Sequence, residues 1–259
     1  MKTGYSTNVP AVEQAARLLL ALSRQVPAKM NLTDLCRKVG IHKSKGYAVL
    51  NTLQAFGFIQ RDGDGKRYGL GPGLIALGRS ALDNLNFKEV VDPFLAGLAQ
   101  ETGSPAFFGV LADQQVFVIA KNEGDGRFGL TIRLGQRYPV SHGAHGKAIA
   151  AFLPEAERKT LLDQEKLFFH GDPARLDRRR LERELSRCRR EGYAEDPGDM
   201  HPQIQALAAP VFSSGGRLTG VLFVTGLIPK NRMKPFGRKV AENARAVSRL
   251  LGAEVEEAS

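Results

Sequence analysis

The sequence predicts an α+β protein with an N-terminal winged helix-turn-helix, a linker helix, and a C-terminal domain built on one antiparallel sheet with flanking helices. Two amphipathic helices joined by a tight turn are expected at residues 31–56, and a strand, a turn and a second strand follow at 58–70. From about residue 88, strand and helix patterns alternate. A chain of 259 residues is long enough for about two domains. We therefore expect residues 1–70 to form the winged domain, 71–87 the linker and 88–259 the C-terminal domain.

The winged domain is expected to start with a helix that opens at Pro10. Apolar residues at helical spacing predict its inward face: Val12, Ala15, Ala16, Leu19 and Leu22. Asn31 can cap the next helix and Gly40 can end it. A second motif helix is expected at 43–56, with these residues facing the core: Val49, Leu50, Leu53 and Phe56. Gly46 lies on that side, so we expect it to allow close packing against the preceding helix.

The opposite face of the second motif helix carries side chains that suit the major groove of DNA. They are Lys43, Ser44, Lys45, Tyr47, Ala48 and Asn51. The first three are expected on phosphates and on acceptor edges such as guanine, because they begin the helix. We expect Asn51 to read adenine and Tyr47 to touch a thymine methyl group or a phosphate.

A hairpin with a basic tip is expected directly behind this helix, because Asp64-Gly65 is a strong turn signal between two strand patterns. Arg61, Lys66 and Arg67 flank the tip, where a wing meets phosphates or the minor groove. Two amphipathic helices alone would also fit an ordinary small bundle. The hairpin is what favours a winged helix-turn-helix that binds duplex DNA.

Charge is distributed unevenly along the chain. Residues 1–71 carry 11 Lys+Arg against 4 Asp+Glu, a net of +7, whereas the remainder carries 26 against 23, a net of +3. This pattern indicates a head that binds a polyanion and a nearly balanced second domain. No apolar run is long enough for a membrane span, the first residues lack a signal-peptide pattern, and the two cysteines fall in different domains. We therefore expect a cytoplasmic protein with reduced thiols.

The linker is expected to begin with a Gly-Pro-Gly hinge at 71–73 and to continue as a helix. Its apolar face contains Leu74, Leu77, Ala81 and Leu85. That face can pack on its own domain or on a second copy of the chain, and we favour the second copy. Beyond the linker, helices are expected at 90–101, 142–153, 154–162, 176–193 and 235–252. A strand pair is expected at 105–123 around a turn at 112–114, a single strand at 127–135, and a second strand pair at 205–227 around a Ser-Ser-Gly-Gly turn.

These motifs, in this order, resemble the IclR family of bacterial transcription regulators along nearly the whole chain. The matching segments are VEQAARLLLAL, LTDLCRKVGIHKSKGYAVLNTLQAFGFI, RYGLGPGLIALG, ETGSPAFFGVL, GKAIAAFLP, REGY, LAAPVF and the closing helix. The resemblance implies a C-terminal GAF-like domain that binds a small effector. It also implies a homodimer or a dimer of dimers that represses or activates a catabolic operon.

The resemblance further implies an effector site formed by Ala144, His145, Asp196, Ala206, Phe223 and Thr225. The Gly-rich HGAHG segment before a helix can present free N–H groups to an anion, and His145 adds a titratable proton. The same segment could be only a tight turn with a capping role. Many family members have cysteine at the Ala206 position and a small hydroxyl residue at the Phe223 position. We therefore expect a carboxylate larger than a two- or three-carbon acid, with aromatic acids among the candidates.

Two other classes of function share some of these sequence features. His145, Asp196 and Ser141 could be imagined as a catalytic set, but the sequence has no nucleophile elbow, no metal-ligand spacing and no phosphate loop, so we expect no enzyme, no metal and no cofactor. The other alternative is an effector-independent DNA-binding protein whose C-terminal domain serves only oligomerisation. A ligand-induced rise in melting temperature would argue against that alternative. The sequence leaves open the effector, the operator, the sign of regulation and the choice between dimer and tetramer.

Overall fold

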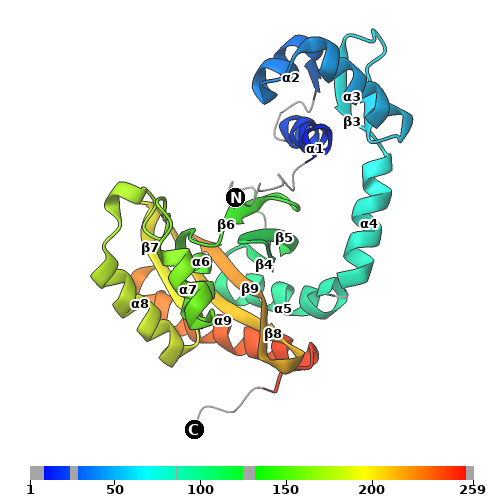
Figure 1. The fold of residues 1–259 in the computed structure, drawn as a ribbon. Coiled ribbons are helices and arrows are strands. Elements are labelled where there is room, and N and C mark those ends of the chain that lie inside the picture. The colour runs from blue at the N-terminus through cyan, green and yellow to red at the C-terminus, as the bar shows by residue number, and fades with distance from the viewer. Residues whose placement is uncertain (1–8, 24–28, 86, 125–131, 255–259) are drawn as a thin grey trace. The chain divides into compact units, whose positions relative to one another are not determined.

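The computed structural model describes residues 9–23, 29–85, 87–124 and 132–254, and it divides the chain into two compact units, Met1–Leu85 and Asn86–Ser259 (Figure 1). Both units mix helix and sheet, so the predicted α+β class is confirmed. Within the described residues, no helix is both long and apolar enough to span a membrane.

The N-terminal unit is a winged helix-turn-helix. Its elements are α1 (Pro10–Ser23), β1 (Lys29–Asn31), α2 (Leu32–Val39), α3 (Lys43–Ala55), β2 (Ile59–Arg61), β3 (Arg67–Leu70) and α4 (Gly73–Leu85). The Asn31 side chain accepts the Asp34 N–H and caps α2, and Gly40 ends α2 with a left-handed φ of 75°. β3 lies between β1 and β2 in a three-stranded antiparallel sheet. The predicted motif therefore forms as expected, with a short strand before it that the sequence did not indicate.

The core of this unit agrees with the prediction for Leu50, Leu53 and Gly46 on α3 but corrects it for α1. Gly46 is buried, and a Cβ built there would lie 2.3 Å from the Cys36 sulfur on α2, so its expected role in close packing is confirmed. On α1 the buried side chains are Leu18, Ala21 and Leu22, whereas Val12 and Ala16 are exposed. Apolar residues occur nearly all round α1, so the spacing alone did not single out the buried side.

The end of α3 and the start of α4 form a packed junction. α3 ends at Ala55, so Phe56, predicted in the core, is 68% exposed and stacks on Phe58 instead. The Gly71 N–H donates to the Phe58 carbonyl, and the Gly73 N–H donates to the Gly57 carbonyl at 2.9 Å. A Cβ on Gly71 would lie 2.2 Å from the Gly57 oxygen. The segment expected to be a hinge is therefore tied to the helix-turn-helix.

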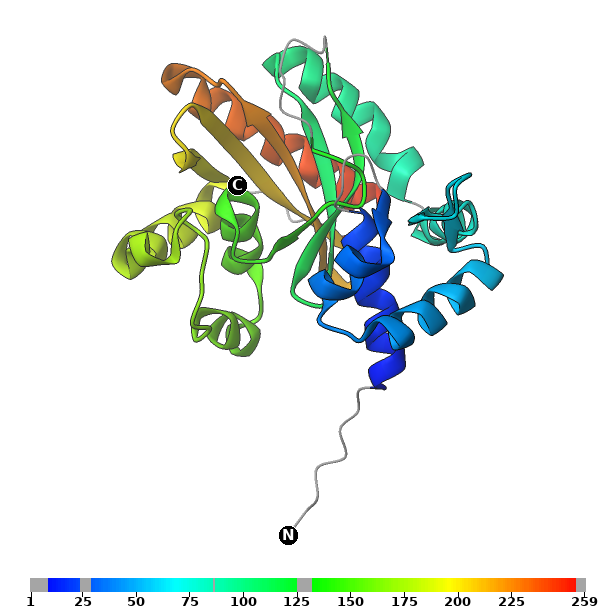
Figure 2. The ribbon, with the colours of Figure 1, turned by 90° about the horizontal axis from the view of Figure 1, so that it is seen from above.

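The C-terminal unit is built on a six-stranded antiparallel sheet in the order β6-β5-β4-β9-β8-β7. Its strands are β4 (Ala106–Ala112), β5 (Gln115–Asn122), β6 (Arg137–Pro139), β7 (Ala194–His201), β8 (Ile204–Ser213) and β9 (Arg217–Gly226). Its helices are α5 (Phe87–Thr102), α6 (Gly143–Phe152), α7 (Glu155–Leu162), α8 (Arg178–Glu191) and α9 (Lys230–Leu250). α5 and α9 pack on one face of the sheet, and α6 and α8 belong to the core on the other (Figures 1 and 2).

Alternation along the strands separates the two cores. On β9, Leu222 and Val224 belong to the core beneath α5 and α9, while Val221 and Phe223 belong to the core beneath α6 and α8. Phe223 is thereby aimed at the face that carries the start of α6. This alternation places the site described below.

Three sequence expectations differ from this unit. The third strand was expected at 127–135; residues 127–131 lie outside the described part, residues 132–135 are not a strand, and the strand is β6. β7 was not expected because its sequence AEDPGDMH contains proline and glycine, which fit only an edge strand. α9 begins at Lys230 rather than near residue 235, and Pro235 lies inside it.

Candidate functional site

The predicted DNA-contact residues lie on α3 and on the hairpin of β2 and β3 in the winged unit. Of the predicted contact residues on α3, the exposed ones are Lys43, Ser44, Lys45, Tyr47 and Ala48, and Asn51 is half-buried. No acidic residue lies in the first turn of α3, and its first residue is a lysine, so the helix start suits phosphate binding. Lys66 and Arg67 are exposed beside Gly65 at the wing tip. The structure thus brings the recognition helix and the basic hairpin together as a continuous N-terminal unit.

Arg61 is placed differently from the other wing residues. It is half-buried, and its Nη2 donates to the Asn51 Oδ1 at 2.6 Å. Its guanidinium carbon lies 5.0 Å from the centroid of the Tyr68 ring and 5.4 Å from that of Tyr47. Hydrogen bonds from Asn51 and Arg61 lower the pKa of the Tyr47 hydroxyl. Arg61 therefore bridges the wing and α3 instead of extending from the hairpin tip.

A cavity of about 90 Å³ lies within the C-terminal unit, and its wall contains all six residues expected at an effector site. Ala144 and His145 come from α6, Asp196 from β7, Ala206 from β8, and Phe223 and Thr225 from β9. The other lining residues are Ile132, Tyr138, His142, Gly143, Met200 and Ile204. Segments more than 80 positions apart along the chain therefore meet around one small space.

Aromatic rings make up much of the cavity wall. The rings of His142 and His145 stack with centroids 5.0 Å apart, and each lies within 5.2 Å of the Tyr138 ring. The Phe223 ring lies 5.5 Å from His145 and 5.1 Å from Phe107 behind it. Contacts of this kind favour a flat, ring-shaped ligand, because offset rings attract one another.

The two cavity histidines are neutral and each has a ring nitrogen to spare. Burial lowers the pKa of His142 to about 4, and burial together with the neighbouring His142 lowers the pKa of His145 well below its ordinary value. The His142 Nδ1 and the His145 Nε2 are buried and have no hydrogen-bond partner among the described residues. Buried polar atoms are nearly always paired, so these two nitrogens indicate a place for a ligand or water.

Asp196 is the acidic group of the cavity, and its position is fixed by the backbone. Its Oδ1 accepts the N–H groups of Gly198 at 3.0 Å and Asp199 at 2.6 Å. Burial raises the pKa of Asp196 above its ordinary value, although these N–H groups oppose the shift. No lysine or arginine appears among the described residues that line the cavity. Among the described lining groups, the N–H groups at the helix start and the neutral histidine rings are the ones that could donate hydrogen bonds to an anionic ligand.

Lys147, on α6 beside the cavity, anchors a buried charge cluster. Its fully buried Nζ lies 2.9 Å from the Glu184 Oε2, 3.6 Å from the Asp199 Oδ2 and 3.2 Å from the Glu195 carbonyl oxygen. Arg180 bonds Glu184 at 2.8 Å and Asp199 at 2.5 Å. Burial tends to raise the pKa values of both carboxyls, but the two cations and their hydrogen bonds outweigh it and hold both pKa values below the ordinary range.

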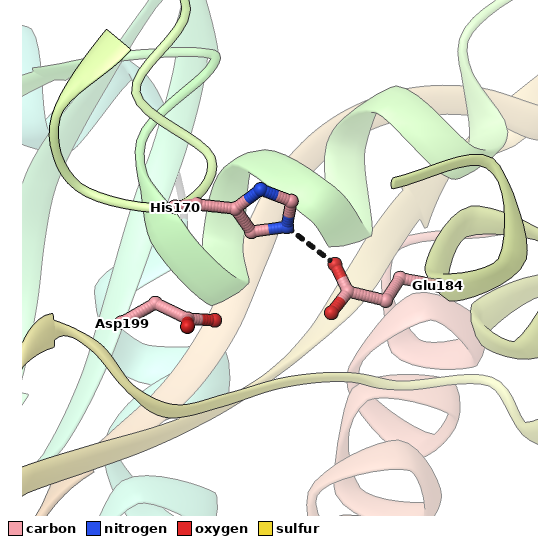
Figure 3. A group of neighbouring side chains, drawn as sticks. All are labelled: His170, Glu184 and Asp199. Carbon is pink, nitrogen blue, oxygen red and sulfur yellow. Dashed lines mark hydrogen bonds and ion pairs between the residues drawn. The ribbon is translucent and has the colours of Figure 1, made fainter. Parts of the chain in front are cut away.

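Part of this cluster has the composition of a metal site. His170, Glu184 and Asp199 place their ligand atoms within 4.8 Å of one another, and Figure 3 shows the three side chains converging, with His170 bonded to Glu184. Lys147 and Arg180 already balance the charges of the two carboxylates. A metal ion would have to displace a buried ammonium group, so we assign no metal role to this cluster.

Several cavity residues were not identified from the sequence. His142 is the first residue of the HGAHG segment and Tyr138 lies just before that segment, so their nearness to His145 along the chain was the available signal. Met200 reaches the cavity because β7 is irregular between Asp196 and His201, which no sequence pattern indicated. Ser141, considered as a nucleophile, instead accepts the Phe168 N–H with its hydroxyl oxygen. Its role in the fold is therefore structural.

Comparisons with known proteins connect both units to one family. Residues 11–63 match the model of the IclR helix-turn-helix domain, and residues 79–249 match that of the bacterial transcriptional regulator IclR C-terminal domain. The glycerol operon regulatory protein of Streptomyces griseus is 32% identical over 95% of this chain and 98% of its own length. These matches are to transcription regulators and not to enzymes.

Solved structures give the same relationship. An IclR transcriptional regulator from Alicyclobacillus acidocaldarius is similar, with a TM-score of 0.81, 30% identity, and coverage of 93% of this chain and 98% of that one. An IclR homologue from Microbacterium hydrocarbonoxydans, complexed with 4-hydroxybenzoate, shares the fold with a TM-score of 0.78 and 20% identity, covering 93% of this chain and 99% of that one.

Proposed function

The chain belongs to the IclR family of bacterial DNA-binding transcription regulators, and from this premise we propose that it controls a catabolic operon in response to a small carboxylate held in the cavity of its C-terminal unit. The observation that carries the proposal is the pair of unpartnered histidine nitrogens inside that cavity. We place the protein in the cytoplasm with its DNA, and we divide it into a winged domain at 1–70, a linker at 71–87 and an effector domain at 88–259.

The cavity favours a single-ring acid as the effector. A ring can stack among Phe223, His145 and Tyr138, and a volume of about 90 Å³ leaves room for little more than one ring. Its carboxylate would lie at the start of α6, where the Ala144 and His145 N–H groups have no partner within the helix. The 4-hydroxybenzoate complex of the structural neighbour from Microbacterium hydrocarbonoxydans supports this class of ligand. Asp196 and Thr225 would contact the polar substituents, beside Ala206.

Duplex DNA is the proposed partner of the winged unit. Lys43, Ser44 and Lys45 would meet the DNA at the start of α3, with Tyr47 and Ala48 following along the groove. Lys66 and Arg67 would contact the backbone from the wing. Replacing Lys66 with alanine should weaken binding to all DNA sequences similarly and lower the slope of log K against log salt by about 0.9.

A homodimer or a dimer of dimers is the proposed assembly, formed in part through α4. Ile75 and Leu77 on this helix are exposed, at 75% and 54%, and Leu74 is half-buried. Ala81 and Leu85 belong to the same predicted face, but their side chains lie outside the described part. Because Gly71 and Gly73 are bonded to the end of the helix-turn-helix, a movement of α4 would carry the DNA-binding unit with it. Effector control requires different effector affinities for the two arrangements of the DNA-binding units.

A thermal-shift panel tests the effector. The purified full chain would be heated with glyoxylate, pyruvate, benzoate, 4-hydroxybenzoate and cyclohexanecarboxylate. An acid present at about 100 times its Kd stabilises the folded protein by about 2.7 kcal/mol, which raises Tm by roughly 5–10 °C. We expect the single-ring acids to produce that shift, and the same compound to change the affinity for DNA.

Variants at Phe223 sharpen the assignment. Phe223→Ser should abolish the shift caused by ring acids and admit the smaller ones, while Phe223→Leu keeps the cavity apolar and serves as its matched control. Stabilisation by glyoxylate or pyruvate alone would contradict the ring-acid assignment. Stabilisation by no acid, with DNA binding intact, would favour the effector-independent alternative in which the C-terminal domain serves only oligomerisation.

A further inference from the structure

Asn51 and Arg61 form a joined unit on the DNA-binding side of the winged domain. Asn51 lies on α3 with the exposed residues of the recognition helix, and Arg61 is the last residue of β2. The Asn51 Oδ1 accepts the Arg61 Nη2 at 2.6 Å. One of the two lone pairs on the only acceptor atom of the Asn51 side chain is therefore already used within the protein.

Aromatic rings hold the guanidinium in place for this bond. Arg61 is the cross-strand neighbour of Tyr68, and its guanidinium carbon lies 5.0 Å from the buried Tyr68 ring and 5.4 Å from the Tyr47 ring on α3. The Arg61 Nε is buried and without a hydrogen-bond partner in the described part of the chain. A guanidinium in contact with two rings tends to stay near Asn51, because moving away gives up those ring contacts.

This arrangement changes what Asn51 can recognise. Reading adenine requires an acceptor for N6–H₂ and a donor for N7, and a free asparagine supplies both. Here the Arg61 cation at the Asn51 oxygen disfavours a second donor such as adenine N6–H₂, and a guanidinium has no acceptor at all. The donors that remain are the Asn51 amide hydrogen not bonded to the Tyr47 hydroxyl and the guanidinium N–H groups. Guanine presents two acceptors, N7 and O6, in the major groove. We propose that Asn51 and Arg61 together form a reader that presents mainly donors and selects guanine in the operator.

The proposal rests on the DNA-binding function and adds to it a base preference and the pair of residues that sets it. It also separates these two residues from Lys66, whose exposed position at the wing tip suits a phosphate, which every sequence offers. Loss of Lys66 should cost affinity uniformly. Loss of Asn51 or Arg61 should cost affinity only for duplexes that carry guanine at one position.

Selection from a random duplex library tests the proposal. The full chain would select its preferred sites, and competition assays would then compare all four base pairs at each position of the selected site. The variants are N51A, R61M, the N51A/R61M pair, K66A, and Q54A as a control for a polar residue exposed on the same helix. Unfolding curves recorded for every variant check that each is folded.

We expect the wild-type chain to prefer guanine at one position by about 5- to 150-fold, the range that a good paired contact provides. N51A and R61M should each lose that preference at the same position, and the double variant should lose no more than either single variant, since the residues act as one unit. K66A and Q54A should keep the preference.

Two results would overturn the proposal while leaving the DNA-binding function intact: loss of an adenine preference in N51A, or an unchanged set of base preferences in both single variants. Failure of the wild-type chain to select any sequence would instead contradict the regulator function itself. The two failures are therefore distinguishable in one experiment.

Discussion

Replacing Lys147 with methionine tests whether the effector domain depends on the buried charge cluster beside its cavity. The Lys147 side chain is fully buried, and its Nζ lies 2.9 Å from Glu184 and 3.6 Å from Asp199. Methionine fills a similar volume without the charge. The substitution therefore leaves two partly buried carboxylates with Arg180 as their main cation.

The expected loss of stability follows from that imbalance. Removing one partner of a buried ion pair typically costs about 3–5 kcal/mol, because the remaining charge is uncompensated. Arg180 still bonds both carboxylates, so we expect the lower end, about 3 kcal/mol, or a fall in Tm of roughly 6–12 °C. Adding Glu184→Gln should recover part of the loss, since it removes one uncompensated charge.

Urea unfolding monitored by far-ultraviolet circular dichroism measures this effect. Lys239→Met is the matched control, because Lys239 pairs with Glu101 on the surface, where both side chains are nearly half exposed. A surface pair of this kind contributes at most about 1 kcal/mol. The reasoning is refuted if Lys147→Met costs no more than Lys239→Met.

The same comparison has a pH dependence with a definite sign. Glu184 and Asp199 have lowered pKa values in the folded protein, so the stability they contribute is present at neutral pH and is lost as the pH falls through those values. Lys147→Met should raise both pKa values and shrink this contribution. Its deficit relative to wild type should therefore be largest at neutral pH and smaller near pH 4.

Two further predictions concern glycine packing and the cavity histidines. Gly46→Ala should destabilise the winged unit by about 1–3 kcal/mol and weaken DNA binding, because the new Cβ would meet the Cys36 sulfur at 2.3 Å. Gly78→Ala should be neutral or stabilising in the same unfolding assay, because a Cβ at that position meets nothing within 4 Å. Equal behaviour of the two variants would contradict the packing role of Gly46. His142 and His145 have lowered pKa values in the folded protein. Below the ordinary pKa of 6.5, the unfolded chain therefore takes up protons that the folded chain does not. Stability should fall as the pH drops from 6.5 towards 4, by up to about 1.4 kcal/mol per pH unit for each histidine. The double variant His142→Phe/His145→Phe should flatten that loss in urea titrations at several pH values, and an unchanged slope would show that these histidines are not the source.

Local signals predicted the helix-turn-helix well. Asn31, Gly40 and Gly46 each act through neighbours close in sequence, so their roles could be derived from the residues themselves. The position of Arg61 could not be derived in that way. It depends on the pairing of Arg61 with Tyr68 across the wing and on a contact with Asn51 on a different element. Turn signals predict that a hairpin exists but do not place its side chains against a helix.

The cavity shows the same division between local and long-range information. The resemblance indicated six lining residues, and the structure brings all six together. Tyr138 and Met200 join them through the short edge strand β6 and the irregular strand β7, respectively. Neither strand has a regular apolar alternation, and so neither was predicted. Lys147 was also missed as a charge centre, because its partners lie 37 or more positions away along the chain.

The central claim, that the N-terminal unit binds DNA sequence-specifically, is tested most directly by comparing two Kd values. One is for a duplex that the protein selects from a random library, and the other is for a scrambled duplex of the same composition. Both would be measured by gel shift over a range of salt concentrations. A regulator of this family should bind the selected duplex about 10³-fold or more tightly than the scrambled one at physiological salt, and both affinities should fall as salt rises. Equal affinity for the two duplexes, or no binding to either at low salt, would contradict the assignment of the N-terminal unit as a sequence-specific DNA-binding domain.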